Sequence, residues 1–399
     1  MNRVFITGAG IISALGVNKT EVLESLRKHR SGIAPLIYLN TLHRGIPAGE
    51  VKRSNREMMQ MLGMPPEEIT TRTSLLGMIA VDEALQQAGL ETDAGMRLAL
   101  VSGTTVGGMD MSEQYYKDFL ENDTRNAYIA THDCGACTEM IANRTGMFSM
   151  LDTISTACSS AANAIMLGAK LILHQRADAV VAGGCECITR FHLNGFNSFL
   201  ILDGEACKPF DEHRAGLNLG EGAAYVVLES GESLRRRNRE PLCRLSGWGN
   251  ACDAFHQTAS SPRGEGAVLS MTKALASASL SPSEISYVNA HGTGTQNNDL
   301  SEGIALERVF GKVPPVSSTK SFTGHTTSAA GGVEAVISLL ALQHNFIPVN
   351  LNFSSPMKEL SFRPSTHDIP AFPLRHILSN SFGFGGNNTS LIFSKAEDS

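Results

Sequence analysis

Three short polar motifs of this 399-residue chain carry side chains suited to covalent chemistry. Cys158 stands in the run Thr-Ala-Cys-Ser-Ser, His291 in Asn-Ala-His-Gly-Thr, and His325 in Lys-Ser-Phe-Thr-Gly-His. A thiolate attacks acyl carbons readily, and imidazoles accept protons or donate hydrogen bonds to developing negative charge. One thiol and two imidazoles, each set among small residues and glycine, therefore indicate acyl transfer through a thioester.

The setting of Cys158 predicts a turn between a strand and a helix. Residues 152–157 are β-prone, and residues 159–174 are rich in alanine and leucine and begin with two serines that would cap a helix. At a helix N-terminus, free N–H groups and the helix dipole favour a thiolate and supply donors for an oxyanion. A buried cysteine that acts as a small hydrophobic residue is the alternative, and alone it would be favoured. The two histidine motifs reverse that preference.

The two candidate catalytic histidines, His291 and His325, have the same predicted setting. His291 follows the apolar segment 285–290, and His325 comes soon after the segment 315–319; each segment is typical of a strand. A glycine adjoins each histidine, at position 292 or 324. A histidine beside a glycine turn at the end of a strand is expected at a surface or cleft.

Other motifs follow in order along the chain. They are Val-Phe-Ile-Thr-Gly-Ala-Gly at 4–10, Val-Ala-Gly-Gly at 181–184, Lys-Pro-Phe-Asp at 208–211 and Asn-Ser-Phe-Gly-Phe-Gly-Gly-Asn at 380–387. With the three reactive motifs, they make the chain resemble the β-ketoacyl-[acyl-carrier-protein] synthases of the thiolase superfamily, most closely the elongating type II enzymes. The resemblance covers essentially the whole chain.

This resemblance implies both a fold and an activity. The fold would be α/β, a duplicated thiolase-like sandwich of five αβαβα layers. The activity would be that of a 3-oxoacyl-[acyl-carrier-protein] synthase, an acyltransferase. An acyl group would move from a carrier-protein phosphopantetheine to the cysteine, and malonyl-carrier protein would then lose carbon dioxide and attack the thioester, extending a fatty-acyl, polyketide or polyene chain.

The resemblance also implies roles for the reactive residues. Cys158 would be the nucleophile, and its backbone N–H would pair with that of Phe384 to hold the thioester oxyanion. His291 and His325 would bind the malonyl carbonyl and stabilise the enolate. The residues that organise the histidines by charge and hydrogen bonding would be Lys320 and Glu334.

Further residues would contact the substrate. Thr293 and Thr295 resemble the threonines that bind the pantetheine arm, and Phe384 matches a gating phenylalanine between flexible glycines. Val106 and Phe196 fall where the family lines its acyl tunnel, although an ordinary core role is nearly as well supported. Chain length cannot be derived from them, because one methylene changes selectivity by only about 1–3 kcal/mol.

The expected partner is an acyl carrier protein, and the expected assembly is a homodimer. The family usually places basic residues on the helix that corresponds to 64–72, but here this segment reads Met-Pro-Pro-Glu-Glu-Ile-Thr-Thr-Arg. Basic residues that could compensate are Lys52, Arg53, Arg56, Arg72, Lys208 and Arg125. The departure suggests a dedicated carrier in a specialised lipid, polyene or polyketide pathway.

Composition fits this class and argues against several others. A net charge of −6 and a pI near 6.1 argue against nucleic acid as a partner. No run approaches about 18 apolar residues, so no membrane span is expected and the protein should be cytoplasmic. The pairs Cys134/Cys137 and Cys185/Cys187 lack a second pair at zinc-site spacing, so neither a metal nor a cofactor is expected.

Alternating patterns predict two similar halves, residues 1–240 with the cysteine and residues 241–399 with the two histidines. The likeliest seam is the basic segment 235–241, so the active site should form where the halves meet. Expected strands lie near 3–8, 97–105, 151–156, 178–183, 222–229, 242, 285–290, 316–319 and 388–394. Expected helices lie near 19–28, 71–89, 159–174, 267–279, 299–310 and 329–344.

Three alternative functions share single features with this sequence. A nicotinamide oxidoreductase is suggested by Gly8 and Gly10, but Ser13 replaces the third glycine of the fingerprint and residues 27–30 are basic. A degradative thiolase would need a second cysteine near the C-terminus, yet no cysteine follows Cys252. A non-catalytic chain-length factor would lose the nucleophile, so retention of the cysteine and both histidines argues against it.

Overall fold

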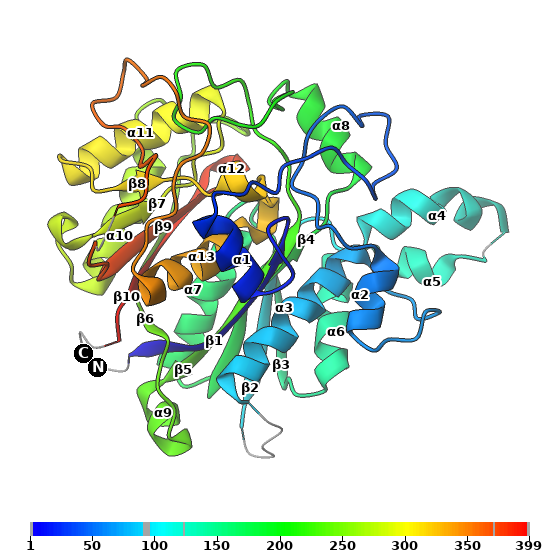
Figure 1. Cartoon of the computed structure of the whole chain (residues 1–399). Coiled ribbons are helices and arrows are strands. Elements are labelled where there is room, and N and C mark those ends of the chain that lie inside the picture. Colours follow the sequence, from blue (N-terminus) through cyan, green and yellow to red (C-terminus); the bar gives the residue numbers. More distant parts are fainter. Residues whose placement is uncertain (1–2, 91–95, 123, 370–371, 397–399) are drawn as a thin grey trace.

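The computed structural model describes residues 3–90, 96–122, 124–369 and 372–396 (Figure 1). Within this part of the chain, ten strands form one mixed sheet in the order β3-β2-β4-β5-β1-β6-β10-β9-β7-β8. Their bounds are β1 Val4–Ser13, β2 Leu98–Gly103, β3 Met150–Ile154, β4 Ala179–Glu186, β5 Gly222–Ser230, β6 Cys243–Cys252, β7 Tyr287–Asn289, β8 Val316–Ser317, β9 His376–Phe382 and β10 Asn387–Ser394.

Helices alternate with these strands. The α-helices are α1 Lys19–Arg27, α2 Asn55–Met61, α3 Arg72–Ala88, α4 Met109–Asn122, α5 Asn126–Ile129, α6 Cys134–Thr145, α7 Ser160–Leu173, α8 Arg190–Ser198, α9 Gly231–Arg237, α10 Glu265–Ala278, α11 Gln296–Phe310, α12 Lys320–Thr323 and α13 Ala330–His344. Short 3-10 turns are η1 Ala130–His132, η2 Pro282–Glu284, η3 Thr327–Ala329 and η4 Phe384–Gly386.

The sheet repeats one strand order twice. From the centre outward, the first half runs β1-β5-β4-β2-β3 and the second runs β6-β10-β9-β7-β8. In each half the two inner pairings are antiparallel and the two outer ones are parallel. A three-residue antiparallel pairing of β1 with β6, from Val4–Leu245 to Ile6–Cys243, joins the halves. The domain boundary at 240/241 itself stays a prediction.

Two helices lie between the halves and others cover their outer faces. α7 and α13 contact each other, with α7 against β4 and β2 and α13 against β5 and β9. α3 covers β1, β5 and β4 on one side, and α10 covers β6 and β10 on the other, with α11 beside it (Figure 1). Residues 330–342 of α13 are all buried, as expected for a helix that is apolar on all sides. The arrangement is the expected thiolase-like α/β sandwich.

Gly8 and Gly10 lie inside β1, where α3 crosses it closely. A Cβ added to Gly10 would stand only 2.0 Å from the backbone oxygen of Ala80, so a larger residue would separate the helix from the sheet. These glycines therefore serve contact between helix and strand. They do not form the phosphate-binding turn that an oxidoreductase would need.

One predicted helix is wrong. Residues 64–71 form no helix and connect α2 to α3, which begins at Arg72. Arg72 is buried, and its guanidinium binds the Glu221 carboxylate at 2.5 Å and also the Val51 and Arg53 carbonyls. Burial and this ion pair remove Arg72 from the basic residues that could meet a carrier protein.

Other differences are smaller. The segment 235–241, predicted as a seam, carries the end of α9 before β6 begins. β9 was not predicted, and neither were most of the short helices. Among the described helices, none is long and apolar enough to cross a membrane.

Candidate active site

Cys158 lies in the predicted turn between β3 and α7. Ala157 takes a left-handed conformation at φ +51°, which bends the chain sharply before the buried thiol. The loop at Gly383 sits directly on this turn, because a Cβ there would be 3.2 Å from the Cys158 nitrogen. The next N–H along that loop, from Phe384, donates to the thiol. The backbone N–H groups of residues 158 and 384 are thus neighbours, as an oxyanion site requires.

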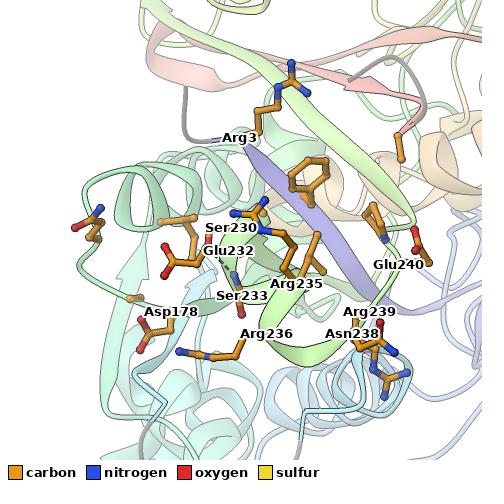
Figure 2. Close-up of a pocket in the computed structure, with 18 of the residues that line it drawn as sticks. Arg3, Asp178, Ser230, Glu232, Ser233, Arg235, Arg236, Asn238, Arg239 and Glu240 are labelled. Atoms are coloured by element: carbon orange, nitrogen blue, oxygen red, sulfur yellow. Dashed lines mark hydrogen bonds between the residues drawn. The ribbon is translucent and has the colours of Figure 1, made fainter.

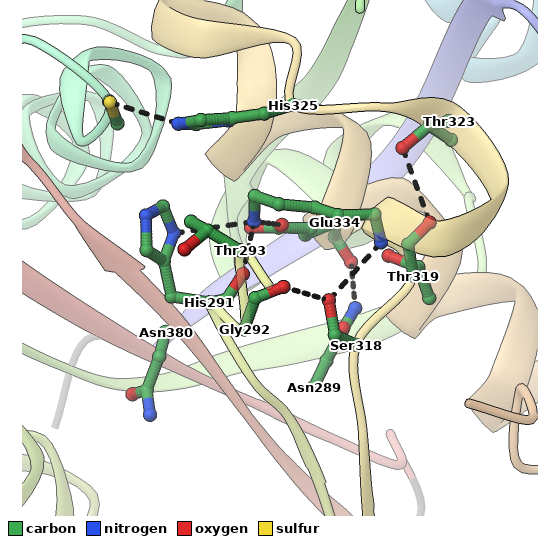
Figure 3. Close-up of polar contacts among 12 residues, drawn as sticks. Asn289, His291, Gly292, Thr293, Ser318, Thr319, Thr323, His325, Glu334 and Asn380 are labelled. Atoms are coloured by element: carbon green, nitrogen blue, oxygen red, sulfur yellow. Dashed lines mark hydrogen bonds and ion pairs between the residues drawn. The ribbon is translucent and has the colours of Figure 1, made fainter. Parts of the chain in front are cut away.

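His325 points at the thiol. Its Nε2 lies 3.1 Å from Cys158 Sγ (Figure 3). Its backbone is fixed on both sides, because its N–H donates to the Asn218 carbonyl at 2.7 Å and its own carbonyl accepts from Gly220 at 2.9 Å. Gly324 supplies the positive φ of +69° that turns the chain into this position.

His291 completes the cluster. Its ring is nearly perpendicular to the His325 ring, with centroids 5.2 Å apart. One ligand-type atom from each of Cys158, His291 and His325 lies within 4.8 Å of the others. The structure therefore brings together the three reactive residues predicted from separate motifs. That no metal takes part stays a prediction, which metal analysis of the purified protein would check.

Lys320 connects the histidines to the central helix. Its Nζ donates to the His291 carbonyl at 2.6 Å, lies 3.3 Å from His291 Nδ1 and binds the Glu334 carboxylate of α13 (Figure 3). An ammonium group can only donate, so Nδ1 of His291 must accept. The proton of a neutral His291 is therefore on Nε2. Ser318 adds a second link, because its hydroxyl donates to the Gly292 carbonyl at 2.6 Å.

The site holds its imidazoles neutral. Burial, followed by the Lys320 charge, lowers the pKa of His291 and of His325 well below the usual value. Burial raises the pKa of the Cys158 thiol to about 11, although Lys320 and the Phe384 N–H oppose this shift. The expected lowering of the thiol pKa by the helix is thus wrong. Cys158 precedes the N-cap residue Ser159, outside the first turn, and there burial outweighs the helix terminus.

The two serines expected to cap α7 do not cap it in the usual way. Ser159 occupies the N-cap position without a side-chain bond to the helix N–H groups. Its hydroxyl lies instead within hydrogen-bond distance of two acceptors, the Thr156 carbonyl at 2.7 Å and Asn387 Oδ1 at 2.8 Å, which share its one proton. Ser160 donates to the Ala157 carbonyl at 2.6 Å. Both serines therefore brace the turn that holds Cys158.

A cavity of about 240 Å³ opens onto the cluster. Its polar wall includes Thr293 and Thr295, whose hydroxyls are 2.8 Å apart. Its apolar wall includes Phe196 and Phe384, whose rings stack with centroids 5.7 Å apart. Val106 does not line this cavity; it is buried in the core against α3 and α6. The tunnel roles of Phe196 and Val106 stay predictions.

A larger open hollow of about 1170 Å³ lies elsewhere, around α9 and the C-terminal end of α7 (Figure 2). Charged side chains, including Arg3, Arg235, Arg236 and Asp178, surround it. It contains no cysteine or histidine, and it is one helix length, about 20 Å, from the turn that holds the nucleophile. A choice of site by cavity volume alone would therefore place the chemistry around α9, far from the cysteine and the two histidines.

Sequence reasoning missed two acids that hold the His291 loop. Glu302 accepts the N–H groups of His291 at 2.9 Å and Gly292 at 2.7 Å, and Asp299 accepts that of Thr293 at 2.9 Å. Both acids are buried on α11. Glu302 follows Asp299 by three residues, so both lie on one face of the helix. Two acids on the buried face of an expected helix were the sequence signal that could have identified them.

Comparisons with known proteins agree with this geometry. A family model described as "Beta-ketoacyl synthase, N-terminal domain" matches residues 1–233, and one described as "Beta-ketoacyl synthase, C-terminal domain" matches residues 242–354. Nodulation protein E of Rhizobium meliloti (strain 1021) is 35% identical over 408 residues, covering 98% of each chain. The 3-oxoacyl-[acyl-carrier-protein] synthase 2 of Staphylococcus aureus (strain COL) is 31% identical over 410 residues, covering 99% of each.

Solved structures show the same relationship. The ishigamide ketosynthase/chain length factor has a TM-score of 0.91 and 30% identity, with 99% of both chains covered. A chain of the structure described as "Ketosynthase (ApeO) in Complex with its Chain Length Factor (ApeC) from Xenorhabdus doucetiae" has a TM-score of 0.83 and 31% identity, with 99% of this chain and 98% of that one covered. The chain therefore belongs to the β-ketoacyl synthase family, a class of condensing acyltransferases with a thiolase-like fold.

Proposed function

We propose that this protein is a catalytically active 3-oxoacyl-[acyl-carrier-protein] synthase. The observation that carries the proposal is the contact of 3.1 Å between Cys158 Sγ and His325 Nε2, with His291 beside it. A non-catalytic chain-length factor would not need a nucleophile, a proton acceptor and a second imidazole directed at one cavity. The cavity walls support a pantetheine-linked substrate, because hydroxyls on one side face aromatic rings on the other.

In the first step, Cys158 Sγ attacks the carbonyl carbon of an acyl thioester carried by an acyl carrier protein. A thiol with a pKa of about 11 must lose its proton during attack, and His325 Nε2 is placed to accept it. The N–H groups of residues 158 and 384 stabilise the oxyanion. The bond to the pantetheine sulfur then breaks, and His325 passes the proton to that sulfur as it departs.

In the second step, the malonyl thioester oxygen accepts hydrogen bonds from Nε2 of His291 and of His325. His325 is neutral again after acylation, and its Nε2 donates in the tautomer that carries the ring proton on that nitrogen. Carbon dioxide leaves, and the enolate carbon attacks the acyl carbon on Cys158. The bond to Sγ breaks, and the departing thiolate takes from water the single proton that condensation consumes.

The acylation step predicts a mass increment on Cys158. Wild-type protein incubated with a panel of acyl-carrier proteins should gain the mass of one acyl group, and Cys158→Ala should gain none. Intact-protein mass spectrometry measures both. Cys252→Ala, which removes an exposed thiol, is the control and should be acylated like wild type. An equal increment on Cys158→Ala would disprove the assignment of the nucleophile.

The second step predicts that His291 affects decarboxylation more than acylation. His291→Ala removes one donor to the enolate oxygen, so malonyl-carrier protein should lose carbon dioxide roughly 100- to 1,000-fold more slowly. The acyl mass increment should still form, because His325 is the histidine that contacts Sγ. Carbon dioxide release in a Cys158→Gln background, which mimics the acylated state, isolates this step. Equal loss in both steps would contradict the division of roles.

The raised thiol pKa predicts a pH dependence. Because the pKa of Cys158 is about 11, its thiol stays protonated at neutral pH, and its reaction with iodoacetamide should rise about tenfold per pH unit between pH 7 and 9. Rates are best measured in Cys252→Ser protein, where the exposed thiol is absent. A rate that levels off near pH 7 would mean that the helix terminus dominates after all.

We also propose that the protein forms a homodimer through β3. This strand is the last of its sheet, so its outer edge has no partner strand among the described residues. Met150 and Leu151 on it are 39% and 41% exposed. An exposed apolar strand edge is a ready template for pairing with another chain.

Light scattering tests the dimer. Wild-type protein should elute at twice the chain mass of 42.6 kDa, and Leu151→Arg should shift it toward the monomer. Leu200→Arg, at a leucine that is 87% exposed, is the matched control and should leave the mass unchanged. A wild-type monomer that gains mass only with a second, different ketosynthase chain would favour a heterodimer.

A further inference from the structure

A buried carboxylate behind the active site has no part in the steps above. Glu186 ends β4 and is fully buried. Its Oε2 accepts hydrogen bonds from Thr104 Oγ1 at 2.7 Å, the Thr105 N–H at 2.9 Å and Ser328 Oγ at 2.5 Å. Ser328 lies three residues after His325. Glu186 therefore ties the ends of two strands to the turn that follows the catalytic histidine.

His192 stands between this carboxylate and the aromatic wall of the cavity. It lies in the first turn of α8, which Thr189 caps through the His192 N–H at 3.1 Å. Its Nε2 is 3.6 Å from Glu186 Oε1, and its ring also hydrogen-bonds the backbone of Cys187. The side chain is buried, and burial lowers its pKa, so it is a neutral ring anchored by polar contacts.

The ring of His192 continues into a stack of aromatic side chains. Phe196 follows it by four residues on the same face of α8, with ring centroids 6.1 Å apart and ring planes at 85°. Phe196 in turn stacks on Phe384 at 5.7 Å and 15°. Phe199, one turn further along, meets Phe384 edge to face at 6.2 Å. One face of α8 thus contacts the residue whose N–H reaches Cys158.

The loop around Phe384 depends on this stack for its position. Gly385 and Gly386 have φ angles of +80° and +78°, and Gly383 precedes Phe384, so local backbone preferences hold the loop weakly. A ring held between Phe196 and Phe199 can fix such a loop. Anything that moves Phe196 should then move the Phe384 N–H away from the thioester oxyanion.

We propose that His192 is a positioning residue for acyl transfer, a buried imidazole that holds the Phe196–Phe384 stack and through it the oxyanion N–H of Phe384. This inference rests on the proposed function and adds a residue to it. Because the malonyl step uses the two catalytic imidazoles, His192 should act on acylation and spare decarboxylation. A loss of acylation with decarboxylation unchanged would distinguish the positioning role of His192 from a general loss of structure.

Two substitutions separate the contribution of the His192 ring from that of its polar contacts. His192→Asn keeps a polar group but removes the ring, and His192→Phe keeps the ring but removes the polar anchor. The initial rate of the Cys158 acyl mass increment should fall about three- to tenfold in His192→Asn. It should recover most of the wild-type rate in His192→Phe. Carbon dioxide release, measured with each substitution in the Cys158→Gln background, should stay within about twofold of the parent.

His376→Leu is the matched control. It removes another buried histidine, at the far end of β9 from the site, about 20 Å from Phe382 along the strand. It should lower thermal stability without changing the acylation rate. If the His192 variants fail to fold, Phe196→Leu interrupts the same stack from the next ring and should give the same selective loss of acylation.

The outcomes separate the two proposals. If wild-type protein forms no acyl-enzyme with any carrier, the proposed function fails. If wild-type protein is acylated and His192→Asn and Phe196→Leu are acylated equally fast, the positioning role is wrong. It is also wrong if acylation and decarboxylation fall together in His192→Asn, because that pattern indicates general disruption of the site.

Discussion

The active site depends on one buried ammonium group. Lys320 Nζ is almost completely enclosed, and it is stable there because the Glu334 carboxylate and the His291 carbonyl surround it. Breaking such a pair costs roughly 3–5 kcal/mol, since the remaining charge is left without a partner. The ammonium joins a loop from one strand end to the central helix α13. Burial, and after it the charge of this ammonium, lowers the pKa of both neighbouring imidazoles and keeps them neutral.

The positions of the reactive side chains follow from the way in which two similar half-sheets meet around α7 and α13. Cys158 lies two residues before the start of α7, and Glu334 lies on α13. The helices are rich in small residues, and Gly331 of α13 leaves so little room that a Cβ would come within 2.8 Å of the Ala162 nitrogen in α7. Close contact of these two helices brings the thiol from one half to the histidines of the other.

Much of this site could be predicted from the sequence because its signals are local. A cysteine before an alanine-rich helix and histidines beside glycine turns depend on neighbouring residues, and the structure brings them together. The error at 64–72 has the opposite origin. Arg72 is buried with Glu221 as its ion-pair partner. This partner lies 149 residues away, and no local sequence pattern indicates it.

The thiol pKa and the roles of Glu186 and His192 could not be predicted for the same reason. The pKa is a balance between burial and charges brought in from distant segments, so helix position alone gave the wrong direction. His192 matters only because Phe196, on its own helix, meets a loop almost 190 residues further on.

The strand pairing at the centre of the sheet, where the half-sheets meet, also places the first and last described strands close together. Val4 of β1 and Phe393 of β10 are both paired with Leu245 of β6, on its two sides, which places them about 10 Å apart. A linker of a few residues could therefore join the ends of β1 and β10 without disturbing the sheet. New termini could then be opened in an exposed loop, such as the one around Leu42, so the sheet does not require β1 to come first along the chain.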